Sequence, residues 1–168
     1  RQAREHTIET RGQEDYVLDY KPLPWRRTPG HYAACLLGGA IGDALGAGVE
    51  FEDLKGIRQL FGNEGIENYV ECYGRVGSIT DDTQMTLFTA EGLLRGHARF
   101  LEDGRSSLVL EEVLKAYWRW LLTQSEQPDG AHQIGSGGLL EIPELHARRA
   151  PGNTCLAALR SGVVGTTT

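Results

Sequence analysis

Apolar residues recur at helical spacing in this chain, and this feature constrains its fold more than any other. The clearest run comprises Ala33, Leu36, Leu37, Ala40, Ile41 and Ala44. Intervals of three and four residues place such side chains on one side of an α-helix. Thr28 and Pro29 precede the run as a typical N-cap and first helical residue. Since no segment alternates apolar and polar residues convincingly, the sequence predicts an all-α fold.

The same reasoning predicts further helices over residues 54–61 and 108–122, and from Asn153 or Thr154 to Leu159. Another helix begins near Thr80, and Gly96 is expected to end it, because glycine is a frequent helix terminator. Glycines at 38, 39 and 42 cost up to about 1 kcal/mol each in an exposed helix. We therefore expect another backbone to approach the first helix closely at these glycines.

The chain divides by composition into two parts. Residues 1–28 are polar and of mixed charge, and their only apolar cluster lies between Tyr16 and Tyr20. We interpret them as an extension outside the core. Residues 29–168 are predicted to form the N-terminal portion of a globular domain, since 40% of the chain is hydrophobic and 24% is charged.

Charge and cysteine content exclude several functional classes. The net charge of −6 argues against a nucleic-acid partner. The most apolar stretch, residues 33–49, is interrupted by Asp43 and several glycines, so no membrane span is expected. Three cysteines at unpaired spacing indicate reduced thiols, and no secretory signal is visible. These features predict a cytoplasmic protein.

The segment Ser78-Ile79-Thr80-Asp81-Asp82-Thr83 places two carboxylates and two threonine hydroxyls at the start of a predicted helix. Magnesium and calcium require several hard oxygen ligands of this kind. The alternative is helix capping, because threonine and acidic residues favour the positive end of a helix. Composition alone favours capping.

A second group of candidates lies in Gly42-Asp43-Ala44-Leu45-Gly46, followed by Glu50. Asp43 interrupts an apolar helix, and a buried carboxylate without a partner is costly. The favoured interpretation of Asp43 is a structural hydrogen bond to a neighbouring turn. Glu50 is better placed to reach a ligand, although an isolated acid of this kind is more often solvated.

Three segments together resemble the ADP-ribosylglycohydrolase family, in particular the dinitrogenase reductase-activating glycohydrolase type. They are Gly39-Ala40-Ile41-Gly42-Asp43-Ala44-Leu45-Gly46 with Glu50, then Thr80-Asp81-Asp82-Thr83-Gln84-Met85, then Arg149-Ala150-Pro151-Gly152-Asn153-Thr154 before Ala157-Ala158-Leu159. Their order and spacing agree with the family over residues 31–162. With this resemblance, capping alone becomes the minor interpretation of Asp81 and Asp82.

The resemblance implies an all-helical fold around a centre of two magnesium ions. Thr80, Asp81 and Asp82 inherit the role of metal ligands, and Glu50 inherits a catalytic or substrate-orienting role. The implied reaction removes ADP-ribose from a modified protein side chain, with arginine as the favoured acceptor. Which carboxylate acts as the base stays open. The glycine-rich segment 135–138 is a further candidate for lining the ADP-ribose cleft.

Members of this family carry a second metal motif of Asp-x-Asp-Thr type in their C-terminal half, and residues 1–168 contain none. The expectation is that the C-terminal half lies on another chain or in residues beyond Thr168. The alternative is a truncated, inactive form. The first is favoured, because nothing before residue 162 looks degenerate.

A second function from a different class is also open. Some family members are similar to immunity proteins that neutralise ADP-ribosyltransferase toxins. The polar extension at residues 1–28 motivates this hypothesis, because an extended segment can order on a partner. A disordered tail is an equally open explanation of the extension. A structural pseudoenzyme is the third and weakest hypothesis.

Overall fold

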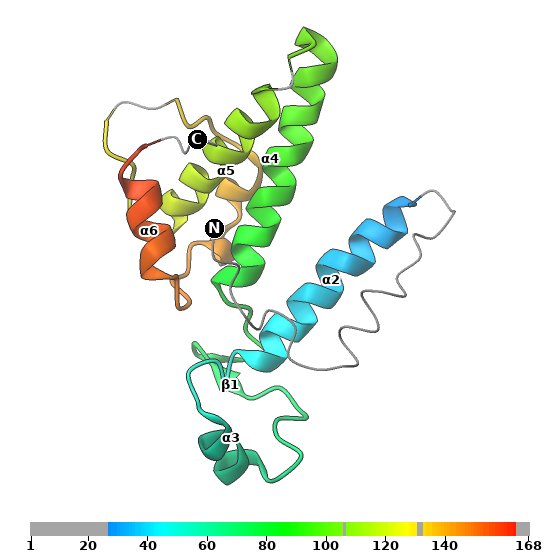
Figure 1. Cartoon of the computed structure of the whole chain (residues 1–168), viewed down its shortest axis with the longest axis vertical. Coiled ribbons are helices and arrows are strands. Elements are labelled where there is room, and N and C mark those ends of the chain that lie inside the picture. The colour runs from blue at the N-terminus through cyan, green and yellow to red at the C-terminus, as the bar shows by residue number, and fades with distance from the viewer. Residues whose placement is uncertain (1–26, 106, 131–132, 164–168) are drawn as a thin grey trace, which may run out of the picture. The chain divides into compact units, whose positions relative to one another are not determined.

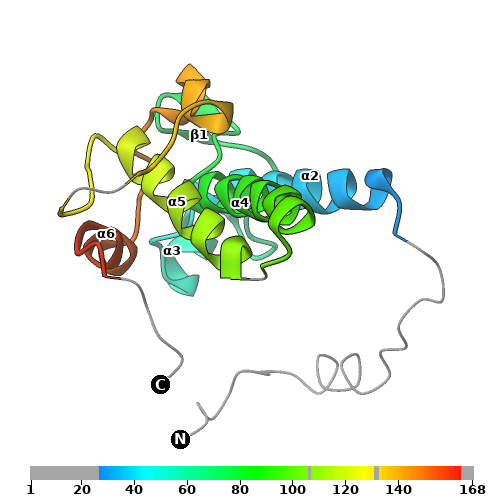
Figure 2. The same ribbon diagram turned by 90° about the horizontal axis from the view of Figure 1, so that it is seen from above.

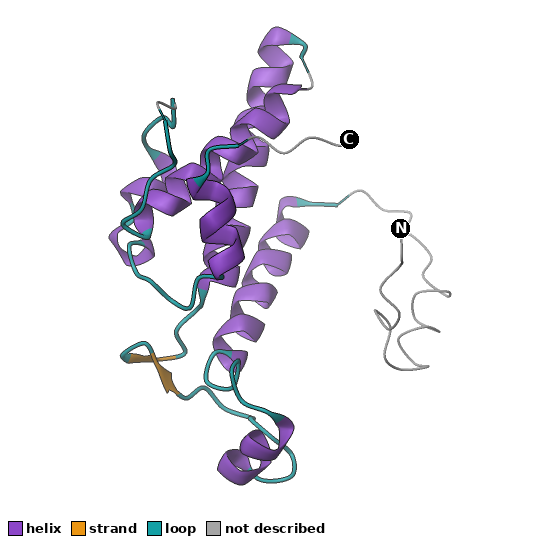
Figure 3. Ribbon diagram, turned by 60° about the vertical axis from the view of Figure 1, so that its left-hand side comes forward, coloured by secondary structure: helices purple, strands orange, loops and turns teal. Residues whose placement is uncertain are grey.

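A computed structural model describes residues 27–105, 107–130 and 133–163 of the chain. The helices are α2 (Pro29–Gly46), α3 (Leu54–Phe61), α4 (Asp81–Asp103), α5 (Ser107–Thr123) and α6 (Asn153–Arg160), with 3-10 helices η1 (Gly138–Glu141) and η2 (Pro143–Leu145) (Figure 1). The described strands are β1 (Glu71–Cys72) and β2 (Arg75–Val76), which form one short antiparallel pair. Figure 3 shows how completely helices dominate. The predicted all-α class is confirmed.

The chain separates into two units, Arg1–Tyr32 and Ala33–Thr168. The first is described only at residues 27–32, where the Thr28 hydroxyl lies 2.8 Å from His31 Nδ1. The expected extension over residues 1–28 therefore falls almost entirely outside the described residues. Its boundary stays a prediction. None of the helices in the described parts is long and apolar enough to cross a lipid bilayer.

Helices α4, α5 and α6 form the hydrophobic core of the second unit, and α4 and α5 lie side by side in Figures 1 and 2. The fully buried side chains include Phe88 from α4, Trp120 and Leu121 from α5, and Leu156 from α6. The predicted bounds of α3, α5 and α6 agree with the structure to within one residue.

The prediction that Gly96 ends a helix is wrong. Helix α4 continues to Asp103 and ends at Gly104, whose φ of 70° is left-handed and whose N–H donates to the Phe100 carbonyl at 2.8 Å. Gly96 is buried inside α4, and a Cβ there would lie 2.6 Å from Val109 Cα. Gly96 therefore lets the backbones of α4 and α5 approach each other, and packing overrides its local tendency to end a helix.

Helix α2 shows the opposite situation. At Gly38, Gly39 and Gly42 an added Cβ would meet nothing within 4 Å. The backbone that we expected to approach these glycines is therefore not supplied by the described residues.

Alanine substitution is expected to have opposite effects at Gly96, which is packed against α5, and at Gly42, which is in open space. Gly96→Ala is expected to lower the free energy of unfolding by about 1–3 kcal/mol through overpacking. Gly42→Ala, the matched control in open space, should raise it by up to about 1 kcal/mol through helix propensity. Urea denaturation measures both. Equal effects of the two substitutions would show that α4 and α5 are not in close backbone contact.

Candidate metal centre

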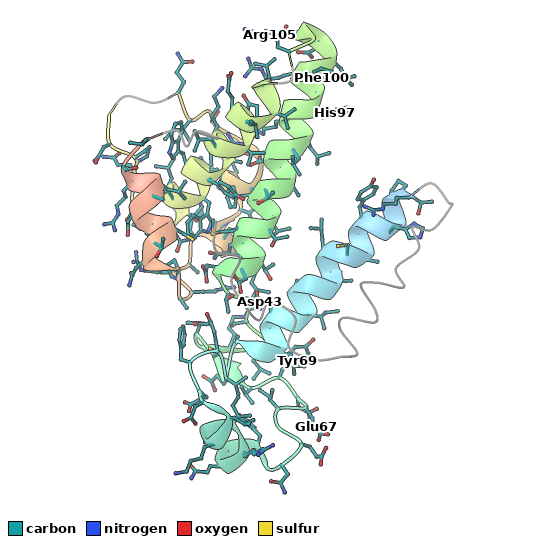
Figure 4. The ribbon with its side chains drawn as sticks, in the orientation of Figure 1. Asp43, Glu67, Tyr69, His97, Phe100 and Arg105 are labelled. Carbon is teal, nitrogen blue, oxygen red and sulfur yellow. The ribbon has the colours of Figure 1, made fainter. Side chains whose placement is uncertain are left out.

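Asp43 joins α2 to the start of α4 (Figure 4). Its Oδ2 accepts the Thr80 N–H at 2.8 Å, and its Oδ1 accepts the Thr80 hydroxyl at 2.7 Å. Thr83 donates its N–H to Oδ2 at 3.3 Å and also donates its hydroxyl to the same oxygen. One carboxylate thus satisfies four donors from a helix start that lies 37 to 40 residues later in the chain. The predicted structural hydrogen bond of Asp43 is confirmed.

Thr80 is the N-cap of α4, and its hydroxyl oxygen accepts the Asp82 N–H at 3.2 Å. The capping interpretation is therefore correct for Thr80. The capping hydrogen bond uses only part of the hydrogen-bonding capacity of Thr80, because a hydroxyl group has one proton and two lone pairs. The proton is donated to Asp43 and one lone pair accepts from Asp82. The second lone pair accepts no hydrogen bond from the described residues.

Asp81 connects the start of α4 to the segment before α6. Its side chain is buried, and its backbone N–H donates to the Arg149 carbonyl at 3.0 Å. Its Oδ2 lies 3.4 Å from the Gly152 N–H, which donates to it. Arg149 in turn donates from Nη1 to the Ile79 carbonyl at 3.2 Å. These contacts place the family segment 149–154 against the family segment 80–85.

Asp82 and Glu50 are exposed and line a common pocket. The pocket has a volume of about 220 Å³, and its other lining residues are Asp43, Gly46, Ala47 and Thr80. Glu50 reaches it from the turn after α2, and Asp82 from the first turn of α4. The structure therefore brings Glu50, Thr80 and Asp82 together, with Asp81 beside them but buried.

Desolvation and repulsion between neighbouring carboxylates raise the pKa values of Glu50 and Asp81. Although Glu50 is exposed overall, partial desolvation of its carboxyl group raises its pKa above the usual value, and the charges of Asp81, Asp82 and Asp43 raise it further. The pKa of Asp81 is also raised, mainly by burial, although the Gly152 N–H opposes the shift. A raised carboxyl pKa means that the ionised group destabilises the folded state above its ordinary pKa. A bound cation would relieve that repulsion.

The donor chemistry of the pocket fits magnesium, but the number of donors does not complete a site. Carboxylate and hydroxyl oxygens are the ligands that Mg²⁺ prefers, and it requires six in near-octahedral geometry. Among the described residues, no group of three or more His, Cys, Asp or Glu converges closely enough to hold an ion. The assignments of Thr80, Asp81 and Asp82 as ligands and of Glu50 as catalytic therefore stay predictions.

Sequence reasoning missed the role of Gln84, which is fully buried. Its Nε2 donates to the Ala147 carbonyl at 2.9 Å, and its Oε1 accepts from Trp120 Nε1 and Gln124 Nε2 at 3.2 Å each. Gln84 thereby fixes α4 to α5 and to the loop that leads to Arg149. The sequence contained one signal for this role, because a polar residue four positions before the core residue Phe88 lies on the same side of the helix.

A second missed cluster holds the glycine-rich segment. Arg119 is buried, and it donates to Glu91 Oε2 at 3.2 Å and to the Ile134 carbonyl at 2.9 Å. Glu91 also accepts from the Leu139 N–H at 3.3 Å. A Cβ at Gly138 would lie 1.9 Å from Glu91 Oε1. The segment 135–138 is thus fixed onto α4 and α5, while its expected place in an ADP-ribose cleft stays a prediction.

The described residues define an all-α protein with an acidic pocket at the N-terminus of α4. A family model described as ADP-ribosylglycohydrolase matches residues 27–165. The chain therefore belongs to the ADP-ribosylglycohydrolase family.

A relative from Archaeoglobus fulgidus, described as an uncharacterized protein, is 41% identical to this chain over 140 residues. The match covers 78% of this chain and 41% of the relative. The chain thus spans about two fifths of the length of the relative that it matches. No solved structure matches the chain significantly.

Proposed function

We propose that the chain carries one part of the active site of a magnesium-dependent ADP-ribosylglycohydrolase. The substrate would be a protein with an ADP-ribosylated side chain, with arginine as the favoured acceptor. The observation that supports this most is that two of the three family segments line one acidic pocket, while the third contacts Asp81 beside it. Asp43 binds Thr80 and Thr83, and Asp81 binds the backbone around Arg149 and Gly152.

In this proposal Thr80, Asp81 and Asp82 would supply oxygen ligands to magnesium, and further ligands would come from outside the described residues. Two ions are expected in the whole family domain. Bound magnesium would orient the ribose hydroxyls and polarise a water molecule. Asp43 does not need to be a ligand, because its oxygens already accept four hydrogen bonds and hold Thr80 in position.

Glu50 is the proposed catalytic residue of this chain. Hydrolysis breaks the bond between ribose C1 and the acceptor nitrogen, adds the water oxygen to C1, and delivers a proton to the departing nitrogen. Positive charge develops on the ribose in the transition state, so a nearby carboxylate stabilises it. A carboxyl group with a raised pKa is also better matched to proton transfer near neutral pH.

The direct test is an assay of ADP-ribose release from ADP-ribosyl-arginine by a protein that holds this chain within a whole family domain. Release is expected with Mg²⁺, and it should stop on chelation and return when Mg²⁺ is added back. Undiminished release after complete metal removal would contradict the proposed metal dependence. No release under any metal condition would contradict the proposed substrate.

The toxin-neutralising alternative rests on the extension, and residues 1–26 lie outside the described residues. No described contact bears on it, so it stays a prediction. Unchanged affinity for a cognate ADP-ribosyltransferase after deletion of residues 1–27, measured by calorimetry, would reject it.

A further inference from the structure

A tyrosine occupies the tip of the β1–β2 hairpin in a backbone conformation that suits asparagine or glycine. The register pairs Cys72 with Arg75, so Tyr73 and Gly74 form a two-residue loop, and their φ angles are 53° and 75°. When φ is positive at both loop positions, Asn-Gly is the preferred sequence. A bulky residue is an outlier there, because its Cβ crowds the backbone.

Packing does not explain why a tyrosine stands in this loop. Ser125 and Ala150 are the other non-glycine residues with positive φ in the described parts of the chain, and both have small side chains. Tyr73 is 40% exposed and lies outside the hydrophobic core, so its burial offsets little of the conformational cost. Strained residues of this kind are concentrated at binding and catalytic sites.

The hairpin is attached beside the acidic pocket. The Cys72 thiol donates to the Ala47 carbonyl at 3.6 Å, which joins β1 to the turn after α2 (Figure 1). Ala47 and Glu50 belong to that turn, and both line the pocket of about 220 Å³. Tyr73 follows Cys72 directly, and neighbouring Cα atoms are about 3.8 Å apart. The tyrosine therefore begins one residue away from the contact with the pocket rim.

The charges of the pocket act on the phenol of Tyr73. Desolvation raises the pKa of this phenol, and the neighbouring Cys72 thiol raises it further. The carboxylates of Glu50 and Asp81 add to the shift, so both lie close enough for their charges to reach the phenol. Tyr73 therefore stays protonated at neutral pH, and it presents an uncharged aromatic ring beside the acidic groups.

An aromatic ring next to an acidic pocket suits a flat organic cation. The face of such a ring attracts a cation electrostatically, and guanidinium groups also stack on it because they are planar and delocalised. Glu50 and Asp82 line the pocket and add negative charge on its side. The guanidinium of ADP-ribosyl-arginine has both properties, whereas an acceptor hydroxyl is uncharged and would gain neither interaction.

We propose that Tyr73 is an acceptor-binding residue, whose ring at the tip of the β1–β2 hairpin stacks on the guanidinium of ADP-ribosyl-arginine beside the acidic pocket. This inference rests on the proposed function, because it concerns the acceptor at the same site. It also explains the strained loop, since the residue at the tip serves the ligand and not the turn.

Stability gives a test that needs no substrate. Tyr73→Asn introduces the residue that this turn prefers, so it should raise the melting temperature of this chain by about 2 °C. A tyrosine kept for structural reasons would instead lose stability on substitution. A lower melting temperature of the Tyr73→Asn variant would therefore overturn the proposal, whether or not the chain is an enzyme.

The kinetic test compares Tyr73→Leu with Tyr73→Phe in a protein that holds this chain within a whole family domain. Tyr73→Leu should raise KM for ADP-ribosyl-arginine about tenfold, the loss expected for a partly desolvated cation–π contact. Its kcat should change by less than about twofold, because the contact is made before and during the reaction alike. Tyr73→Phe keeps the ring, so its KM should stay within about twofold of the parent. The inhibition constant of ADP-ribose, which lacks the guanidinium, should be the same in both variants.

Tyr69→Leu is the matched control, because Tyr69 is 44% exposed and its ring lies against Gly77, away from the loop tip. Its KM should equal that of the parent. An unchanged KM in Tyr73→Leu, an equal rise in Tyr69→Leu, or an equal loss of ADP-ribose affinity would overturn the role of Tyr73 and leave the proposed function intact. A parent that releases no ADP-ribose from ADP-ribosyl-arginine would overturn the proposed function, and this inference with it.

Discussion

Glu50→Gln is expected to lower the turnover of ADP-ribosyl-arginine about 10²- to 10⁴-fold in a protein that holds this chain within a whole family domain. The substitution keeps the size of the side chain and removes its charge and its ability to exchange a proton. Glu50 is exposed at the pocket, and its side chain makes no hydrogen bond with the other described residues, so the folded state should survive its substitution. Steady-state kinetics with a melting curve on the same sample measures both properties.

The matched control is Glu52→Gln, because Glu52 is an exposed acid two residues further along the same turn and does not line the pocket. Its turnover should remain within about twofold of the parent, as expected for a surface residue outside the site. Equal turnover of the Glu50→Gln variant and the parent would remove Glu50 from the mechanism, whatever its position in the pocket.

Asp43→Ala is expected to lower the free energy of unfolding by about 3 kcal/mol or more, because hydrogen bonds to a charged group contribute roughly 1.5–3 kcal/mol each and are not additive. The carboxylate satisfies four donors, and both threonines that supply them are buried. Removing it leaves these donors without their acceptor at the junction of α2 with α4. Urea denaturation of this chain measures the change.

Asp53→Ala provides a control with the same chemical change. Asp53 is the N-cap of α3 and accepts one hydrogen bond, from the Gly56 N–H at 2.7 Å. Its loss should cost about 1 kcal/mol, the usual effect of removing an N-cap. Asp43→Asn should fall between the two alanine variants, since an amide has one accepting oxygen where the carboxylate has two. Similar losses for Asp43→Ala and Asp53→Ala would show that the junction is not held by Asp43.

Local sequence signals predicted the helices well. The N-terminal ends of α2 and α6 and both ends of α3 follow from apolar spacing, proline and capping residues, all of which act within a few positions. Gly96 was misjudged because its role depends on Val109, which belongs to the next helix. A glycine that ends a helix and a glycine that admits a neighbour look alike in sequence.

The sequence indicated which acidic and hydroxyl residues belong to the candidate site, but it did not indicate which hydrogen bonds connect them. The sequence indicated that Asp43 needs a hydrogen-bonding partner, and it could not identify Thr80 and Thr83, which lie 37 and 40 residues away. The ion pair between Glu91 and Arg119 was not foreseen for the same reason, since its members lie on different helices. Long-range pairs of this kind depend on how α2, α4 and α5 meet, which no local pattern encodes.

Magnesium binding by Asp81 and Asp82 is proposed here and can be tested directly. The most direct measurement is the shift in melting temperature on adding Mg²⁺ to a protein that holds this chain within a whole family domain. At a concentration about 100 times the dissociation constant, binding to the folded state alone adds about 2.7 kcal/mol of stability. Asp81→Asn with Asp82→Asn should abolish this shift. Glu102→Gln with Asp103→Asn, an equal charge change at the other end of α4, should retain it. Magnesium stabilisation of the same size in both double variants would contradict magnesium binding by Asp81 and Asp82.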